Sequence, residues 1–340
     1  MIDKSELRRD IVNGDWVLVA TGRRRRPQQF AKPAADKPTS KKDCPFENPQ
    51  KDGNGPAFLW YTKSSEGSGE PPSGWVLQVI KNKFPAVLHH SGRTCPVPIR
   101  DGIYEKMIGI GFHEVLVTRS HTKFLADSSN QEIEYVVRAY RDRILAHKAE
   151  KCLEYIFIFH NHGRAAGASV WHSHSQIIAL PIIPPDVRRS LAGAKLYWLD
   201  TKKCVHCEVV KREKIKKERI IYQNKKFIVL APFASHTAFE VRIFPLEHQS
   251  SFEDIDQESC KYFADALGTI LKKIKRALKN PAYNFFIHTA PIVDGDYSYY
   301  HWHLEILPKT STFAGVELGT GIEVLAISPE EAASYLRKIK

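Results

Sequence analysis

The chain has 340 residues, more than a single hydrophobic core usually supports, so its length predicts two domains or one large duplicated domain. It carries 50 Lys and Arg against 38 Asp and Glu, a formal net charge of +12. This basic balance suits an anionic substrate, a nucleotide or a nucleic acid without choosing among them. No apolar run approaches the ~20 residues that span a bilayer, and no signal-peptide pattern is present, so we expect a cytoplasmic protein with no membrane partner.

In the first half, short apolar runs rich in β-branched and aromatic residues predict strands. Residues 50–74 are rich in Gly, Ser and Pro, and we expect them to form a long loop. Apolar residues at helical spacing predict a helix over 130–148. The expected strands cover residues 16–20, 75–80, 113–118, 155–159 and 176–180.

The second half continues in the same way, with helical periodicity over about 253–278. A last helix is expected to begin near Ser328, because this serine can cap it and Glu331 can close a capping box. The six cysteines are too few and too scattered along the chain for a disulfide framework. The expected strands cover residues 226–230, 239–244, 284–288 and 302–307.

The two halves of the sequence repeat one order of motifs. Each half runs from a Cys-x-x-(Cys or Glu) pair through a segment that begins with Asn-Lys, a strand that leads to a histidine, and a helix, to a final H-x-H. Self-similarity of this kind indicates a duplicated unit. We therefore predict an α+β fold of two tandem units, residues 1–195 and 196–340, each a mainly antiparallel sheet with one long helix.

The repeat gathers scattered residues into a candidate metal site in the second half. Its members are two thiols in CVHC and two histidines at positions that the repeat makes equivalent: Cys204, Cys207, His248 and His301. A Cys2His2 set is typical of a closed, tetrahedral zinc site, so we expect zinc here. The alternative is a pair of buried thiols beside ordinary polar histidines.

The corresponding set in the first half is Cys44, Glu47, His121 and His172. Glu47 stands where the second half has a cysteine. A carboxylate can bind zinc, so a mixed site remains chemically sound, but loss of the metal is the alternative. We expect this site to bind its metal less tightly than the cysteine-paired one.

The segment HSHSQ, residues 172–176, holds two histidines whose roles the sequence must separate. In an extended segment, alternation places His172, His174 and Gln176 on one face and the two serines on the other. His172 has an equivalent in the second half, His301, and each of the two accompanies the metal-type residues of its own half. His174 is not one of these metal-type residues, and its role depends on what surrounds it.

Upstream of HSHSQ, the segment GRAAGAS, residues 163–169, contains glycines that allow backbone to approach a phosphate closely. Asn161 and Ser169 can add hydrogen bonds to phosphate oxygens. A neutral imidazole attacks phosphorus, and the resulting bond is labile, so His174 is predicted to carry a nucleotidyl group covalently. The alternative is a hydrogen-bonded core histidine. His303, in the second H-x-H, lacks such a cradle and is expected to be structural.

With these residues in place, the chain resembles the galactose-1-phosphate uridylyltransferase family, a duplicated branch of the histidine-triad superfamily. The resemblance spans nearly the whole sequence. Its motifs include CPF at 44–46, NKFPA at 82–86, GFHEV at 111–115, AGASVWHSHSQ at 166–176, APFAS at 231–235, YNFFIHTAP at 283–291, YHWHLEI at 300–306 and ELGTG at 317–321.

The resemblance implies two histidine-triad-like units and a ping-pong reaction in which His174 attacks the α-phosphorus of UDP-glucose and carries UMP. Gln176 would stabilise the phosphate oxygens in the transition state. Nucleotide- and phosphate-binding positions of the family fall on Asn82, Asn161, Gly167, Ser169 and Gln176. The metal positions match the two sets above, with Glu47 departing from the cysteine usual there.

Two reactions of this family remain open from the sequence. We expect a UDP-glucose:hexose-1-phosphate uridylyltransferase of galactose metabolism, whose partners are a nucleotide sugar, a hexose 1-phosphate and a second copy of the chain in a homodimer. The H-S-H-S-Q form is shared with an ADP-glucose phosphorylase branch, which moves adenylyl to phosphate. A histidine-triad nucleotide hydrolase is a further alternative. We expect no nucleic-acid partner, because no recognition motif accompanies the positive charge.

Overall fold

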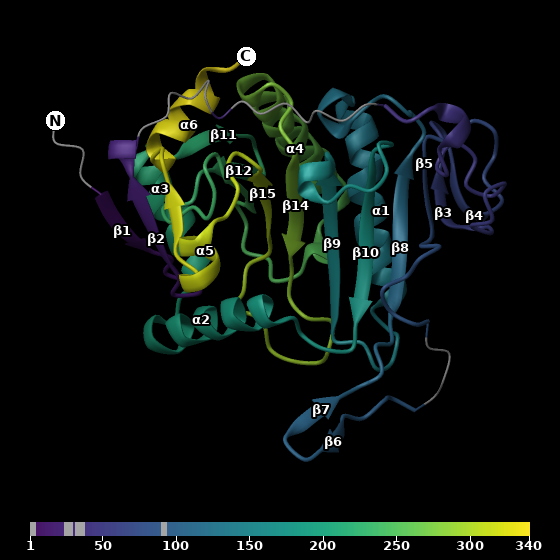
Figure 1. Cartoon of the computed structure of the whole chain (residues 1–340), viewed down its shortest axis with the longest axis horizontal. Coiled ribbons are helices and arrows are strands. Elements are labelled where there is room, and N and C mark those ends of the chain that lie inside the picture. Colours follow the sequence, from purple (N-terminus) through teal and green to yellow (C-terminus); the bar gives the residue numbers. More distant parts are fainter. Residues whose placement is uncertain (1–4, 24–29, 31–37, 90–93) are drawn as a thin grey trace.

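A computed structural model of the chain describes residues 5–23, 30, 38–89 and 94–340. Its main sheet has eleven strands in the order β11-β12-β13-β15-β14-β9-β10-β8-β5-β3-β4, and every neighbouring pair is antiparallel (Figure 1). The strands are β3 (Ala57–Tyr61), β4 (Glu66–Gly69), β5 (Leu77–Lys81), β8 (Phe112–Thr118), β9 (Tyr155–His162), β10 (His174–Leu180), β11 (Ile220–Gln223), β12 (Phe227–Leu230), β13 (Val241–Pro245), β14 (Tyr283–His288) and β15 (His303–Pro308).

The predicted repeat is visible in the order of these strands. The first half contributes β5-β8-β10-β9 and the second contributes β12-β13-β15-β14, so equivalent strands occupy equivalent places. The halves join where β9 pairs with β14, which makes one continuous sheet. The α+β class with antiparallel pairing is therefore confirmed. A boundary between residues 195 and 196 falls within the helix α2 (Pro185–Thr201), and the division into two units stays a prediction.

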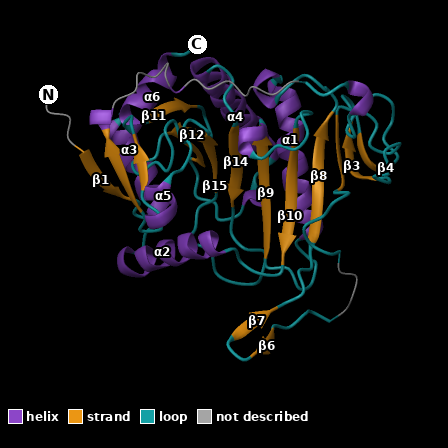
Figure 2. Ribbon diagram, in the orientation of Figure 1, coloured by secondary structure: helices purple, strands orange, loops and turns teal. Residues whose placement is uncertain are grey.

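Two long helices, α1 (Asn130–His147) and α4 (Gln257–Leu278), lie side by side against the sheet, one from each half (Figure 2). The predicted helix at 130–148 is confirmed, and Ser129 and Glu132 form a capping box at its start. The helices approach closely at Gly268, where an added Cβ would lie 2.8 Å from Ile133 Cδ1. Their apolar faces and the sheet enclose the main core. Catalytic groups must therefore lie outside the face of the sheet that these helices cover.

The remaining helices are α3 (Val205–Lys216), α5 (Gly315–Thr320) and α6 (Pro329–Lys338). The cap that Ser328 was expected to supply for α6 is present. None of the described helices is long and apolar enough to cross a membrane. Short 3-10 helices cover Thr21–Arg23, Lys41–Asp43, Leu125–Asp127, Arg164–Ala166 and Phe252–Asp254.

Three features differ from the sequence prediction. Residues 50–74 are not one loop, because β3 and β4 form a hairpin there that extends the sheet. The helices α2 and α3 were not predicted; both have weak apolar periodicity. Although no disulfide framework was expected, Cys95 and Cys152 form a disulfide across 57 residues of sequence. Only the fold brings these two thiols together.

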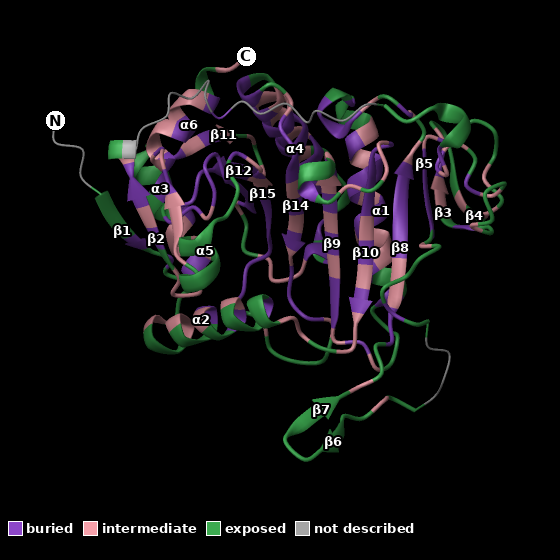
Figure 3. Ribbon diagram, in the orientation of Figure 1, coloured by how far each residue is buried: buried purple, intermediate pink, exposed green. Residues whose placement is uncertain are grey.

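Cys95 precedes an arm formed by β6 (Ile99–Asp101) and β7 (Tyr104–Lys106), and the disulfide joins it to Cys152, between α1 and β9. Every residue of these two strands is exposed, and the arm projects away from the main sheet (Figure 3). The arm belongs to the connection between β5 and β8, two strands that position the candidate active site.

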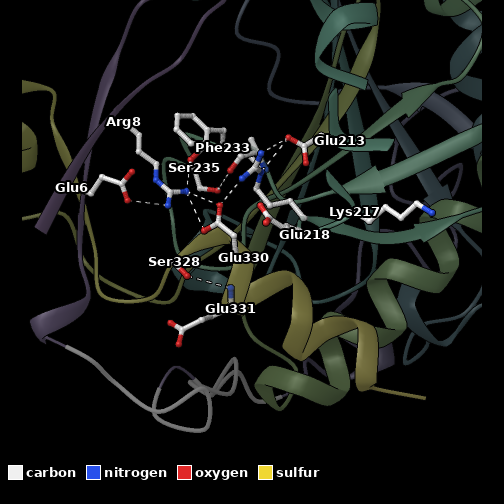
Figure 4. A network of polar contacts seen from close by, with 12 residues as sticks. Glu6, Arg8, Glu213, Lys217, Glu218, Phe233, Ser235, Ser328, Glu330 and Glu331 are labelled. Atoms are coloured by element: carbon white, nitrogen blue, oxygen red, sulfur yellow. Dashed lines mark hydrogen bonds and ion pairs between the residues drawn. The ribbon is translucent and has the colours of Figure 1, made fainter. Parts of the chain in front are cut away.

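The ends of the chain meet in a small second sheet of β1 (Ser5–Arg9), β2 (Trp16–Ala20) and β16 (Glu323–Leu325), in which β16 runs parallel to β2. A polar network anchors it (Figure 4). Arg8 and Arg219 both stack on the ring of Phe233, and both bind the carboxylate of Glu330 on α6. The first strand and the last helix are therefore held against the second half.

His236, which contacts Glu323 of β16 in this sheet, contributes to stability in a way that depends on pH. His236 Nδ1 lies 3.3 Å from Glu323 Oε1. Burial opposes the charged form of His236, but the hydrogen bond to Glu323 and the charge of Glu240 outweigh it and raise the pKa of His236 to about 9. Because the folded-state pKa exceeds the unfolded value of about 6.5, the stabilisation is complete below about pH 6.5 and is lost as the pH rises through about 9.

We therefore expect Glu323→Gln to lower the free energy of unfolding by about 1–3 kcal/mol at pH 6. The difference between variant and wild type should fade as the pH rises through 9. Urea unfolding of both proteins across this range measures it. A difference that stayed constant with pH would show that the histidine does not supply the effect.

Candidate active site

His174 is the first residue of β10, and its side chain is buried, with 6% exposed. Its Nδ1 lies 2.8 Å from the carbonyl oxygen of His172. A carbonyl can only accept a hydrogen bond, so Nδ1 carries the proton and Nε2 keeps its lone pair. Burial also lowers the pKa of His174. The site therefore holds a neutral imidazole with a defined nucleophilic atom. The ring of Phe46 lies against it, 5.1 Å between centroids.

The expected alternation along HSHSQ holds within β10. Ser175 Oγ lies 2.5 Å from Tyr140 Oη, on α1, and 2.9 Å from His160 Nδ1. This serine thus faces the helices. His174 and Gln176 point to the opposite face of the sheet, which the two long helices leave uncovered.

Gln176 is linked to Asn82 through a residue that the sequence reasoning did not assign to the site. His113, on β8, places its Nε2 2.8 Å from Gln176 Oε1 and 3.1 Å from Asn82 Nδ2. Asn82 follows the last residue of β5. His113 was visible in the motif GFHEV, but nothing in that motif separated it from an ordinary strand residue.

The predicted phosphate cradle lies at the end of β9. Gly163 and Gly167 flank a 3-10 turn with φ values of 81° and 87°, a backbone conformation that favours glycine. An added Cβ at Gly167 would also lie 3.7 Å from Asn161 Nδ2. Asn161, Gly163 and Ser169 line one pocket. The predicted nucleotide-binding residues therefore fall in two groups, the cradle at the end of β9, whose pocket reaches His172 and Ser173, and the Asn82–Gln176 pair linked across β8.

The second-half metal candidates converge as predicted. The ligand atoms of Cys204, Cys207, His248 and His301 all lie within 4.8 Å of one another. Cys204 caps α3, and Cys207 follows in its first turn. His248 directs Nε2 at the carbonyl oxygen of Ser298, 2.9 Å away, so the lone pair of its Nδ1 faces the Cys207 sulfur at 3.3 Å. Such carbonyl contacts orient metal-binding imidazoles.

The two thiols of this group are in hydrogen-bonding contact. A hydrogen bond from the Cys207 thiol lowers the pKa of Cys204, and the same contact raises the pKa of Cys207. The thiolate of Cys204 in turn raises the pKa of His248. A thiolate beside two imidazole lone pairs is the donor set that a divalent zinc-like cation requires.

In the first half, ligand atoms of Cys44, His121 and His172 also lie within 4.8 Å of one another. Both histidines direct Nε2 at backbone carbonyl oxygens, His172 at Thr118 (2.6 Å) and His121 at Thr39 (2.7 Å). Both Nδ1 atoms therefore keep lone pairs that turn inward, toward the Cys44 sulfur.

Glu47, the fourth residue predicted for this site, is not among the residues whose ligand atoms all converge, but its Oε1 lies 3.4 Å from His121 Nδ1. Both atoms are buried and have no hydrogen-bond partner among the described residues. Two acceptors facing each other without a proton between them are costly unless a cation lies there. Cys44, His121 and His172 thus fit a metal, and the Glu47 carboxylate lies beside them.

The second half repeats the geometry of His174 without its chemistry. His303 Nδ1 lies 3.1 Å from the carbonyl oxygen of His301, the same contact that orients His174. Where the first half has Gln176, the second has Glu305, which pairs with Arg242 at 2.9 Å. A carboxylate at this position repels a phosphate. His303 and Glu305, together with His288, form a third group that could hold a cation.

Comparison with known proteins agrees with this geometry. Residues 1–184 match the family described as galactose-1-phosphate uridyl transferase, N-terminal domain, and residues 108–338 match a domain of unknown function. The chain is 33% identical to the ADP-glucose phosphorylase of Arabidopsis thaliana over 98% of this chain and 93% of that protein. It is 29% identical to the galactose-1-phosphate uridylyltransferase of Thermotoga maritima over 98% of both.

A solved structure supports the same assignment. The crystal structure of the Arabidopsis thaliana ADP-glucose phosphorylase with bound ADP-glucose aligns with a TM-score of 0.80 at 32% identity, covering 99% of this chain and all of that one. The resemblance found in the sequence is therefore confirmed. The chain belongs to the galactose-1-phosphate uridylyltransferase family, and it is a nucleotidyltransferase of that family.

Proposed function

We propose that this protein transfers a nucleotidyl group from a nucleotide sugar to an acceptor through a covalent intermediate on His174. The observation that carries the proposal is the contact of His174 Nδ1 with the His172 carbonyl oxygen, which leaves the lone pair on Nε2. In the first step Nε2 attacks the α-phosphorus, the bond to the bridging oxygen breaks, and sugar 1-phosphate leaves. In the second step a phosphate oxygen of the acceptor attacks the same phosphorus and releases Nε2.

The groups around His174 suit a phosphorus that gains charge on its non-bridging oxygens. Gln176, on the same face of β10, and Asn82, joined to it through His113, supply carboxamides on one side. Asn161 and Ser169 supply donors on the other, with Gly167 allowing the phosphate to approach the backbone.

For the nucleotide, we propose ADP-glucose with phosphate as acceptor as the first candidate. The relative from Arabidopsis thaliana named ADP-glucose phosphorylase is 33% identical, and its structure with bound ADP-glucose aligns over nearly the full length. The UDP-glucose:hexose-1-phosphate reaction expected from the sequence is the second candidate, because the Thermotoga maritima uridylyltransferase aligns over the same span at 29%.

We also propose that both metal groups hold zinc. The Cys204, Cys207, His248 and His301 set would be a closed structural site, and Cys44, Glu47, His121 and His172 a second one. Zinc in such sites supplies a crosslink between distant elements of the fold. In the first half, the crosslink would fix His172, whose carbonyl oxygen orients His174.

The test is a substrate panel. The protein is incubated with α-labelled ADP-glucose or UDP-glucose without acceptor, and acid-labile label on His174 is measured. The labelled protein then receives phosphate or galactose 1-phosphate, and the nucleotide products are identified. Label from ADP-glucose that phosphate discharges as ADP supports the first candidate, and label from UDP-glucose that galactose 1-phosphate discharges supports the second. No label from either overturns the proposal, and release of free nucleoside monophosphate faster than either transfer indicates a hydrolase.

A further inference from the structure

We propose that His113 and Asn284 are positioning residues that fix the carboxamides of Gln176 and Asn161 so that only N–H donors face the phosphate. The inference rests on the proposed nucleotidyl transfer and extends it to residues that do not touch the substrate. A carboxamide has a donor end and an acceptor end of nearly the same shape. If its oxygen faced the phosphate, it would repel the charge that builds in the transition state, so the orientation of each amide matters.

For Gln176, a backbone N–H sets the orientation. Ala86 N donates to His113 Nδ1 at 3.0 Å, and a backbone nitrogen can only donate. Nδ1 of the neutral ring is therefore the acceptor, and the proton lies on Nε2. That N–H points at Gln176, 2.8 Å away, so the oxygen of the carboxamide faces His113. The NH2 group of Gln176 is turned away from His113, toward the open face.

Asn82 is oriented by a second backbone N–H in the same loop. Phe84 N donates to Asn82 Oδ1 at 2.9 Å. The oxygen of Asn82 is thus occupied, and its NH2 group lies beside His113 Nε2, 3.1 Å away. Because both of these nitrogens carry hydrogen, the His113 proton goes to Gln176 and the Asn82 hydrogens remain for a ligand.

For Asn161, the fixed group is a backbone carbonyl. Asn284 Nδ2 donates to the oxygen of Ala166 at 2.7 Å and to Asn161 Oδ1 at 2.8 Å. The Ala166 oxygen can only accept, so the atom of Asn284 that faces it must be its nitrogen. The atom of Asn161 that meets the same nitrogen must then be its oxygen. The NH2 group of Asn161 therefore turns to the cradle, where an added Cβ of Gly167 would lie 3.7 Å from it.

The three carboxamides therefore share one arrangement: each oxygen accepts a hydrogen bond from a donor of the protein. The donor for Asn161 comes from β14, in the second half of the chain, directly paired with β9. The second half thus supplies a group that prepares the site of the first half. A site arranged in this way requires little reorganisation when charge develops on the phosphate.

His113 is tested by replacing it with a side chain that keeps or removes the donor. His113→Met removes the donor without adding charge, and His113→Gln places an amide N–H near the position of Nε2. We expect His113→Met to slow single-turnover labelling of His174 by about tenfold to hundredfold, and His113→Gln to recover most of the rate. His89→Ala, which removes an exposed ring that packs edge-to-face against Phe112, is the control and should label at the wild-type rate.

Double-mutant cycles separate positioning from general damage. His113→Met should have no further effect in a Gln176→Ala background, and Asn284→Leu, of similar shape to asparagine, should have none in an Asn161→Ala background. Wild-type protein that takes no label would overturn the proposed function itself. Wild-type protein that labels, with His113→Met and Asn284→Leu either labelling at the wild-type rate or adding their full effects to the Gln176 and Asn161 variants, would overturn this inference alone.

Discussion

His174→Ala is expected to take no label from a nucleotide sugar and to lose nucleotidyl transfer by about 10⁴-fold or more. The reason is that Nε2 of His174 forms the bond to phosphorus, and no neighbouring group on β10 can replace it. The thermal midpoint should change little, since the side chain contributes one hydrogen bond to the His172 carbonyl oxygen and a contact with Phe46. Labelling, steady-state transfer and thermal unfolding measure these quantities together.

The repeat provides a matched control. His303 has the same contact with the carbonyl oxygen two residues before it, at 3.1 Å, but its neighbour is Glu305 instead of glutamine. We expect His303→Gln to keep covalent labelling of His174 near the wild-type level. Label that persisted in His174→Ala and disappeared in His303→Gln would place the nucleophile in the wrong half and contradict the assignment.

Cys204→Ser is expected to lose one equivalent of zinc and to lower the free energy of unfolding by about 3 kcal/mol or more. Cys204 caps α3, while His248 and His301 follow β13 and precede β15, so the metal would join three elements of the second half. A serine keeps the shape but not the thiolate. Metal analysis of the purified protein and denaturant unfolding measure the two effects.

Two further variants define what this result means. Cys260→Ser alters another buried thiol, in α4 and outside the metal groups, and should keep all of the zinc. Glu47→Ala should lower the bound zinc by at most one equivalent, because it removes a single carboxylate beside the first-half group. Wild-type protein without bound metal would refute both sites, and zinc retained in full by Cys204→Ser would refute the second-half one.

The strands and long helices were predictable because their signals are local. All nine predicted strands appear in the structure within a few residues of their expected ends, since apolar alternation reports the burial of one face. The hairpin of β3 and β4 was missed because its residues are rich in Gly and Ser, and it becomes a strand pair only by adding to the edge of β5. The disulfide between Cys95 and Cys152 was missed for the same kind of reason: its partners meet only in space.

The candidate site was predictable in its chemistry but not in its orientation. The motif around His174 and the cradle before it can be read from consecutive residues. The metal sets were found because the repeat compares one half with the other. His113 and Asn284 were not found, because an isolated histidine or asparagine in a strand carries no signal of its own. Their role depends on which atom of a distant side chain they meet.

By itself, the sequence determined the class of the fold, and from residue type and spacing it predicted the duplication, the metal-type residues and the nucleophile. Tertiary structure alone decided that the two halves share one sheet through β9 and β14. It also decided which nitrogen of His174 is free and which end of each carboxamide is already occupied by a donor of the protein. The physical reason is that a hydrogen bond is directional, and backbone groups far away in the sequence determine these directions.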